Sequence, residues 1–137
     1  MGQKVNPISF RTGVKGCLKW SSKWFSKKNY ADIALEDVAI RGYLEKHYSH
    51  TKIDRVLIER SAEHLKIIIV SAMPGVLIGK GGRDIDILRS KLSKFIDRDT
   101  IEVSVHEIKN AYLSASVMSR TISELLENRV AFKKAAK

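Results

Sequence analysis

Hydrophobic and polar residues alternate along this chain with a period that changes several times, and each change predicts a new element. Apolar residues first recur at helical spacing over positions 35–48, as at Ile40 and Leu44, which predicts a helix with one buried face. Glu36 and Asp37 open this segment, and the helix dipole stabilises acidic side chains in a first turn. We therefore expect the first helix to begin at about position 35.

Two strands are predicted next, joined by a short turn. Residues 53–60 (IDRVLIER) place Val56 and Ile58 on one face, as in a strand with a buried side. Residues 64–72 (HLKIIIVSA) form a nearly continuous β-branched run, which is typical of a buried strand. The positions between them, 61–63, are few enough for a hairpin turn.

A second helix and a third strand follow a glycine-rich loop. In residues 83–96 (RDIDILRSKLSKFI) the apolar side chains lie three or four positions apart, so they share one helix face. They are Ile85, Leu88, Leu92 and Phe95. Residues 100–108 (TIEVSVHEI) alternate apolar and polar side chains, which predicts a half-buried strand.

The last predicted element is one long helix over residues 111–137. Asn110 is in place to cap it, and apolar residues recur at helical spacing as far as Leu125, with Arg129 continuing the same face. No stop signal precedes Lys137. We therefore expect a single C-terminal helix.

Charge divides the chain into three segments. The 25 Lys and Arg exceed the 15 Asp and Glu and leave a net charge of +10, which points to a polyanionic partner. The excess is seven in residues 1–31, zero in residues 32–110 and three in residues 111–137. We interpret these segments as a basic N-terminal arm, a neutral domain and a basic C-terminal helix. The cations of the arm are Lys4, Arg11, Lys15, Lys19, Lys23, Lys27 and Lys28.

The N-terminal arm interleaves these cations with aromatic residues. Such a composition folds poorly alone and orders on RNA, with the cations on phosphates. Trp20 and Trp24 are four positions apart and would share one face of a helical turn. The two tryptophans can stack on RNA bases or pack against the neutral domain, and we favour packing.

The stretch PGVLIGKGG, positions 74–82, is a glycine-rich turn after a predicted strand. Such turns offer backbone amides to a phosphate, either of a nucleotide or of an RNA backbone. A nucleotide-binding loop requires G-x-x-x-x-G-K-[ST], whose hydroxyl holds magnesium. Here Gly75 and Gly79 are one residue too close, and Gly81 stands where the hydroxyl is needed. The sequence therefore argues against a nucleotide cofactor.

A G-x-x-G turn between two helices does fit this stretch, and K-homology (KH) domains clamp about four nucleotides with such a loop. The candidate RNA-binding loop consists of Gly79, Lys80, Gly81, Gly82 and Arg83. Lys80 and Arg83 supply cations beside a helix N-terminus, which suits phosphate; a plain turn is the alternative. Val76 and Ile78 are candidates for the floor of a groove for bases, whereas we expect Ile85 to lie in the core.

The order of predicted elements is helix, strand, strand, short helix, G-x-x-G loop, helix and strand. This is the order of a type II KH domain, in which a helix and a strand precede the core around the loop. We therefore expect an α+β fold with residues 32–110 as the type II KH domain, flanked by the basic arm and the long C-terminal helix.

Six short pieces of sequence occur in a fixed order around this domain. They are MGQKVNP, RTG at 11–13, WSSKWF at 20–25, IER at 58–60, PGVLIGKGG, and LENRVAFKKAAK at the end. Together they resemble the N-terminal half of the bacterial family of small-subunit ribosomal protein three. The family continues into a second α/β domain, and this chain stops where the connection to it should begin.

The resemblance implies a cytoplasmic structural protein in the head of the small ribosomal subunit. Its partners would be small-subunit ribosomal RNA, messenger RNA on the side where it enters, and small-subunit proteins ten and fourteen. The positions matching the family's messenger-RNA contacts are Lys133, Lys134 and Lys137, with Arg129 preceding them. The family commonly has two arginines and a lysine there. Lysine keeps the charge but loses the bidentate fork.

Other classes of protein remain as alternatives or are disfavoured. A free RNA chaperone or assembly factor with a KH domain is the main alternative, and a nucleotide-dependent enzyme is a weaker one. We expect no catalytic site and no small-molecule substrate, because no nucleophile elbow or acid-base pair stands out. The single cysteine and four histidines lack metal-ligand spacing, and no apolar stretch approaches the roughly 18 residues of a membrane helix.

Overall fold

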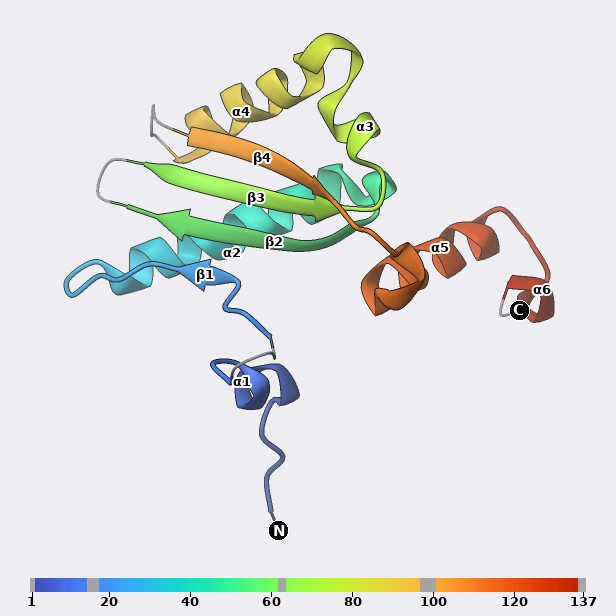
Figure 1. The fold of residues 1–137 in the computed structure, drawn as a ribbon, viewed down its shortest axis with the longest axis horizontal. Helices are drawn as coiled ribbons and strands as arrows, with labels where there is room; N and C mark the ends of the chain where they lie inside the picture. Colours follow the sequence, from blue (N-terminus) through green and yellow to red (C-terminus); the bar gives the residue numbers. More distant parts are fainter. Residues whose placement is uncertain (1, 15–17, 62–63, 97–100, 136–137) are drawn as a thin grey trace.

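A four-stranded mixed sheet forms the centre of the computed structural model, which describes residues 2–14, 18–61, 64–96 and 101–135 (Figure 1). The strand order is β1-β2-β3-β4. β2 (Ile53–Arg60) pairs antiparallel with β3 (Leu65–Ser71), and β4 (Ile101–Glu107) pairs parallel with β3. The short β1 (Ser22–Lys23) pairs parallel with β2, so part of the predicted arm is an edge strand of the sheet.

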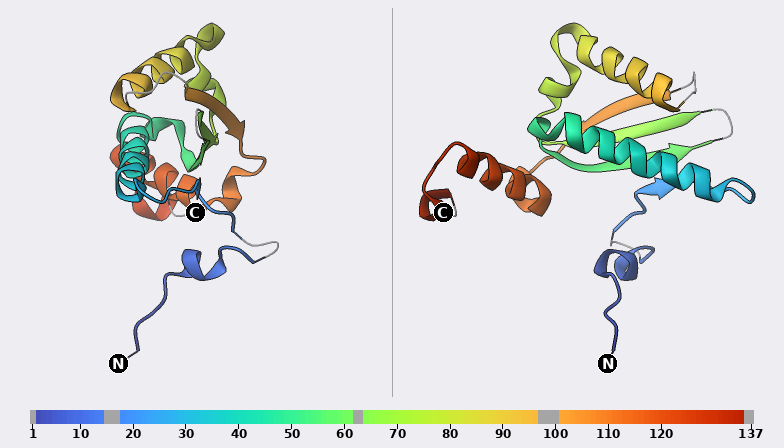
Figure 2. Two further views of the ribbon diagram at one scale, coloured as in Figure 1. Left: turned by 90° about the vertical axis from the view of Figure 1, so that its left-hand side faces the viewer. Right: turned by 180° about the vertical axis from the view of Figure 1, so that it is seen from behind.

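Helices α2 (Tyr30–His47) and α4 (Arg83–Ile96) cover one face of this sheet, with the short α3 (Pro74–Ile78) beside them (Figure 2). The core between the layers is almost entirely aliphatic. Its fully buried members include Ile40 and Leu44 of α2, Ile67 and Ile69 of β3, and Leu88 of α4. These positions follow the predicted periodicities of 3.6 on the helices and 2 on the strands, which confirms the α+β fold.

α2 begins five residues earlier than the expected position 35, so the interpretation of its acidic residues was wrong. Asn29 precedes the helix, and its carbonyl oxygen accepts a hydrogen bond from the Ile33 amide at 3.2 Å. Glu36 and Asp37 consequently lie beyond the first turn, where the helix dipole has little effect. Asp37 is buried on the same face as Ile40 and Leu44 and serves a tertiary contact instead.

The expectation of one long C-terminal helix was also wrong. Asn110 caps only a 3-10 turn, Ala111–Leu113, and the Ser114 hydroxyl caps α5 (Ala115–Glu127) by accepting from the Val117 amide. A Schellman motif ends α5, because the amides of Arg129 and Val130 donate to the carbonyls of Leu126 and Leu125. Arg129 takes a left-handed φ of 60° there. The chain then turns into a separate short helix, α6 (Phe132–Ala135).

The N-terminal residues form one further short helix, α1 (Pro7–Arg11). The Asn6 side chain caps it by accepting from the amides of Ile8 and Ser9. Trp20 and Trp24 do not share a helical face, because residues 18–25 contain no helix. No helix in the described parts of the chain is both long and apolar enough to cross a bilayer.

Candidate nucleic-acid interface

The G-x-x-G loop lies between two helices, as the sequence predicts. α3 ends at Ile78, Gly79 follows as its C-cap, and residues Lys80–Gly82 form a 3-10 turn that leads into α4 at Arg83. Gly79, Gly81 and Gly82 all have positive φ values, of 70°, 68° and 81°. Since L-residues avoid this region, the turn depends on its glycines.

Gly79 is held by sterics as well as by its dihedral angle. A Cβ atom built there would lie 2.8 Å from the Cβ of Asp84 and would overlap its carboxylate. The same carboxylate influences Tyr48: burial, together with the neighbouring Tyr43 and Asp84, raises the pKa of that phenol. Asp84 thus packs directly against the loop backbone, and only glycine leaves room for it.

The side chains around the loop divide into exposed and buried sets. Lys80 and Arg83 are exposed, and neither forms an ion pair with another described residue. Val76 is 51% exposed, while Ile85 packs against the core as expected. An apolar side chain and two unpaired cations therefore face solvent beside an exposed glycine backbone.

The cations predicted for the arm are spread over a long segment. Those that the structure describes are exposed, namely Lys4, Arg11, Lys19, Lys23, Lys27 and Lys28. Lys15 lies outside the described residues. Lys23 differs from the others because its Nζ lies 2.7 Å from Glu59 Oε1, and this hydrogen bond and charge lower the pKa of the Glu59 carboxyl.

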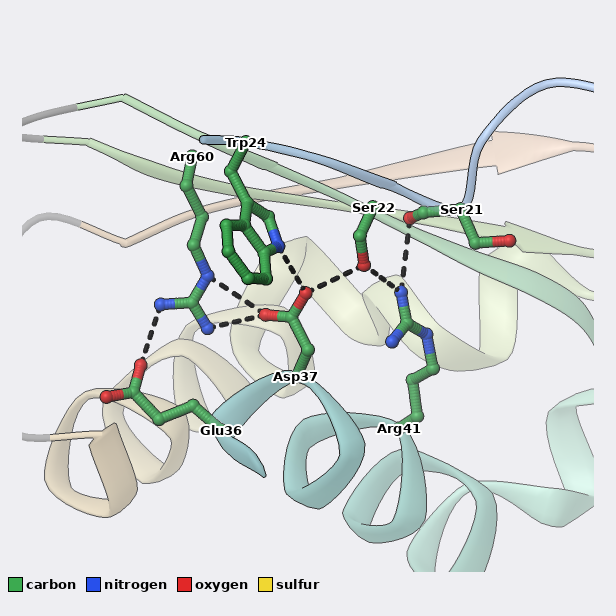
Figure 3. Close-up of polar contacts among 7 residues, drawn as sticks. All are labelled: Ser21, Ser22, Trp24, Glu36, Asp37, Arg41 and Arg60. Atoms are coloured by element: carbon green, nitrogen blue, oxygen red, sulfur yellow. Dashed lines mark hydrogen bonds and ion pairs between the residues drawn. The ribbon is translucent and has the colours of Figure 1, made fainter. Parts of the chain in front are cut away.

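A buried carboxylate anchors the arm to the domain (Figure 3). Asp37 on α2 accepts hydrogen bonds from Ser22 Oγ at 2.7 Å and from Trp24 Nε1 at 2.8 Å. Arg60 at the end of β2 donates to the same carboxylate through Nε and Nη2, and to Glu36 through Nη1. Trp24 therefore packs on the domain, as favoured, whereas Trp20, for which packing was also favoured, is 58% exposed.

Sequence reasoning missed this anchor, although the signal was present. Asp37 is spaced three and seven positions from Ile40 and Leu44, so it belongs to the core face of α2. A buried carboxylate needs a cation and hydrogen-bond donors. Arg60 and Trp24 supply them, but neither is near Asp37 in the sequence.

The C-terminal cations do not lie on one continuous helix. Arg129 is in the turn after α5, and Lys133 and Lys134 are exposed on α6; Lys137 lies outside the described residues. Figure 1 shows that α6, the N-terminal helix α1 and the turn between α3 and α4 are well separated from one another. The structure thus presents three basic regions rather than a single patch.

Among the described residues, no group of three His, Cys, Asp or Glu side chains is arranged to hold a metal ion.

Comparisons with known proteins agree with this geometry. The family model for the KH domain matches residues 39–113. Over its full length the chain is similar to proteins named small ribosomal subunit protein uS3. It is 39% identical to that of Halalkalibacterium halodurans, 41% to that of Thiobacillus denitrificans and 42% to that of Clostridium beijerinckii. The chain spans 61%, 58% and 62% of the length of these relatives.

Proposed function

This chain belongs to the KH domain family, and on that basis we propose that it is a structural, RNA-binding constituent of the small ribosomal subunit. The observation that carries the proposal is a glycine turn between two helices, with two unpaired cations, in a chain 39% to 42% identical to three proteins named uS3. Its setting would be the ribosome in the cytoplasm. The role is one of binding and positioning, not of catalysis.

The G-x-x-G loop is proposed to hold a single strand of RNA. Glycines at positive φ let the sugar-phosphate backbone approach the main chain closely. Lys80 and Arg83 attract the phosphates, and the exposed side chains of Val76 and Ile78 offer an apolar floor for the bases. We expect this strand to be mobile, as messenger RNA is, while other regions hold the ribosome.

The N-terminal arm is proposed to bind small-subunit ribosomal RNA. Residues 1–31 contain no acidic residue, and Lys23 is paired with Glu59 of β2, so the charges of Arg11 and of the other exposed lysines are the ones proposed to meet phosphates. The anchor at Asp37 fixes the start of β1 against the domain. The residues before it extend away from the sheet (Figure 2), in a position to reach a separate RNA element.

The C-terminal cations are proposed to line the side where messenger RNA enters. Converting Lys133, Lys134 and Lys137 to alanine should leave subunit assembly intact and impair translation of structured messages. Loss of assembly would instead assign these residues to ribosomal RNA. Neighbouring proteins in the head are proposed to be small-subunit proteins ten and fourteen.

The decisive experiment is sedimentation of the tagged full chain from cells on a sucrose gradient. Co-migration with small subunits, resistant to a moderate salt wash, is the expected result. A free RNA chaperone or assembly factor would remain in the soluble fractions or associate only with immature particles. Either outcome would overturn the proposed structural role.

Single-stranded RNA binding by the loop is tested separately. The double substitution Lys80→Asp and Gly81→Asp replaces one positive charge and adds two negative charges at an exposed turn. A Cβ on Gly81 meets no atom within 4 Å, but its φ of 68° is unfavourable for aspartate, so some strain is expected within the turn itself. We expect weaker binding with unchanged circular dichroism. Unchanged binding would make the loop a plain turn in this protein.

A further inference from the structure

Two adjoining depressions lie on the side of the domain where the N-terminal arm joins it. One has a volume of about 360 Å³, and its lining includes Trp20, Trp24 and Tyr30. The other has a volume of about 270 Å³. Both include Ser21 and Arg41 in their walls, so they form one continuous surface. None of its lining residues belongs to the G-x-x-G loop.

The first depression contains one aromatic ring that is held in place by a hydrogen bond and two rings that are mostly exposed to solvent. Trp24 is immobilised by its hydrogen bond to Asp37, and its ring centroid lies 5.2 Å from that of Tyr30. Trp20 is 58% exposed and Tyr30 is 64% exposed. Exposed aromatic rings are the surfaces on which unstacked RNA bases are held. Such a pocket is large enough for a flat heterocycle.

The second depression is lined by three arginines from three different elements: Arg41 on α2, Arg55 on β2 and Arg120 on α5. Asp54 and Glu45 also line it, so the local formal charge is three minus two, or +1. Arginine forks are well matched to phosphate.

These arginines are oriented by contacts that leave donors unused. Arg41 Nη2 donates to the Ser21 carbonyl at 3.2 Å and to Ser22 Oγ at 2.6 Å (Figure 3). Toward the residues that the structure describes, Arg55 donates only through Nε, to Asp54 at 2.7 Å, and its side chain is 54% exposed. Since a guanidinium has five N–H donors, Arg41 and Arg55 both keep donors for a phosphate. Arg41 and Arg55 lie in the neutral segment, residues 32–110, so the net charge of that segment did not reveal them.

We propose that this surface binds one unstacked nucleotide of RNA, with its base against Trp20 and Tyr30 and its phosphate on Arg41 and Arg55. The inference deepens the proposed function, since it assumes that the partner is RNA. The arginines favour RNA over an apolar protein side chain, because an apolar occupant would bury their charges without supplying an anionic or hydrogen-bonding partner. The site is a second one, separate from the G-x-x-G loop.

The test measures binding of a labelled single-stranded RNA decamer to the full chain by fluorescence anisotropy of the RNA, and quenching of tryptophan fluorescence in the unmodified chain gives a second signal. Trp20 is one of only two tryptophans, so stacking on it has a direct signal. Trp20→Ala and Arg55→Gln remove a stacking surface and a phosphate ligand. We expect Trp20→Ala to weaken binding about tenfold, the lower part of the range for one stacked base. Arg55→Gln should also weaken binding about tenfold, the lower part of the range for one hydrogen bond to a charged group. Retained circular dichroism confirms that the variants fold, as their exposure predicts.

Matched controls exist for both substitutions. Tyr112→Ala removes an aromatic ring that is 82% exposed and outside the pocket. Arg89→Gln removes an arginine that, like Arg55, is about half-exposed and contacts a nearby aspartate, here at 3.7 Å. Both should bind the decamer like the unmodified chain. Adenosine monophosphate should bind far more weakly than the decamer; equal affinity would overturn the proposal in favour of a free nucleotide.

Failure of this inference and failure of the proposed function give different results. If Trp20→Ala and Arg55→Gln bind normally while Lys80→Asp with Gly81→Asp abolishes binding, the second site is refuted and the loop retains its role. If the unmodified chain binds no RNA, both proposals fail. If RNA leaves Trp20 fluorescence unchanged and another subunit protein quenches it, the site is a protein contact and the inference is overturned.

Discussion

Removing the carboxylate of Asp37 should destabilise the whole domain, because this group joins three segments of the chain. It accepts hydrogen bonds from Ser22 and Trp24 of the arm and from two nitrogens of Arg60 on β2. The side chains of Arg60 and Asp37 are only 4% and 3% exposed. Asp37→Ala would therefore leave a buried guanidinium with Glu36 as its remaining acidic partner.

The magnitude follows from this burial. Removing one partner of a buried ion pair costs about 3–5 kcal/mol, since the other charge stays desolvated. Glu36 still compensates part of the Arg60 charge, which places the expectation at the lower end, about 3 kcal/mol. For a chain of this size, roughly 3 °C is lost per kcal/mol, so the melting temperature should fall by about 10 °C.

Urea unfolding followed by circular dichroism measures this loss. Glu59→Ala is the matched control, because its partner Lys23 also belongs to the arm but both side chains are solvent-exposed, at 38% and 51%. Exposed pairs contribute little, so the control should stay close to the unmodified chain. Exchange of the Ile58 amide, which donates to the Ser21 carbonyl at 2.9 Å, should accelerate in Asp37→Ala.

A free-energy loss below about 1 kcal/mol, or one equal to that of Glu59→Ala, would refute this reasoning. A second variant separates charge from packing. Adding Arg60→Met to Asp37→Ala removes the uncompensated cation, so the double variant should be more stable than Asp37→Ala alone. If the double variant is less stable, lost packing rather than buried charge dominates.

Three further predictions concern the loop, the pH dependence and the salt dependence. Gly79→Ala should lower the free energy of unfolding by roughly 2 kcal/mol, because of its φ of 70° and the overlap with Asp84; adding Asp84→Ala should restore only part of this. Burial opposes ionisation of Asp54, but hydrogen bonds from Ser114 and Arg55 outweigh it and lower its pKa. Its stabilising effect should therefore be complete above the unfolded-state pKa and disappear as the pH falls through the lower folded-state value. Unfolding in urea at pH 7 and pH 3 should show a smaller difference in Asp54→Asn; an unchanged difference would contradict this. RNA affinity should fall with salt by a log-log slope of roughly 0.7 to 0.9 per neutralised phosphate, and a flat response in filter binding would exclude the basic arm as an RNA anchor.

Local patterns were enough to predict most of the domain. Apolar spacing in residues 83–96 predicted α4 with the bounds that it has, Arg83–Ile96, and residues 53–60 predicted β2 equally well. The G-x-x-G turn was recognisable because its glycines and flanking helices are contiguous in sequence. Such features depend on interactions between residues a few positions apart, which a pattern records directly.

The candidate interface was only partly visible in the sequence. Lys80 and Arg83 were identified from their place beside the glycines, and the structure leaves both exposed. The arginines of the second depression were not identified as a site: Arg41 and Arg55 lie in the segment 32–110, whose charges balance, and Arg120 lies in the C-terminal segment, far from both in the sequence. Folding brings Arg41, Arg55 and Arg120 to one surface from α2, β2 and α5.

Local periodicity and glycine's access to positive φ were sufficient to predict the order of elements in residues 32–110, the aliphatic core and the G-x-x-G turn. The start of α2 and the attachment of the arm depend instead on contacts between segments that are distant in the sequence. Asp37 finds its donors 15 and 23 positions away in Ser22 and Arg60. The sequence pattern also did not predict that the C-terminal helix ends before Arg129, where a Schellman motif forms without the usual glycine. These outcomes depend on contacts and backbone angles that neighbouring residues alone do not specify.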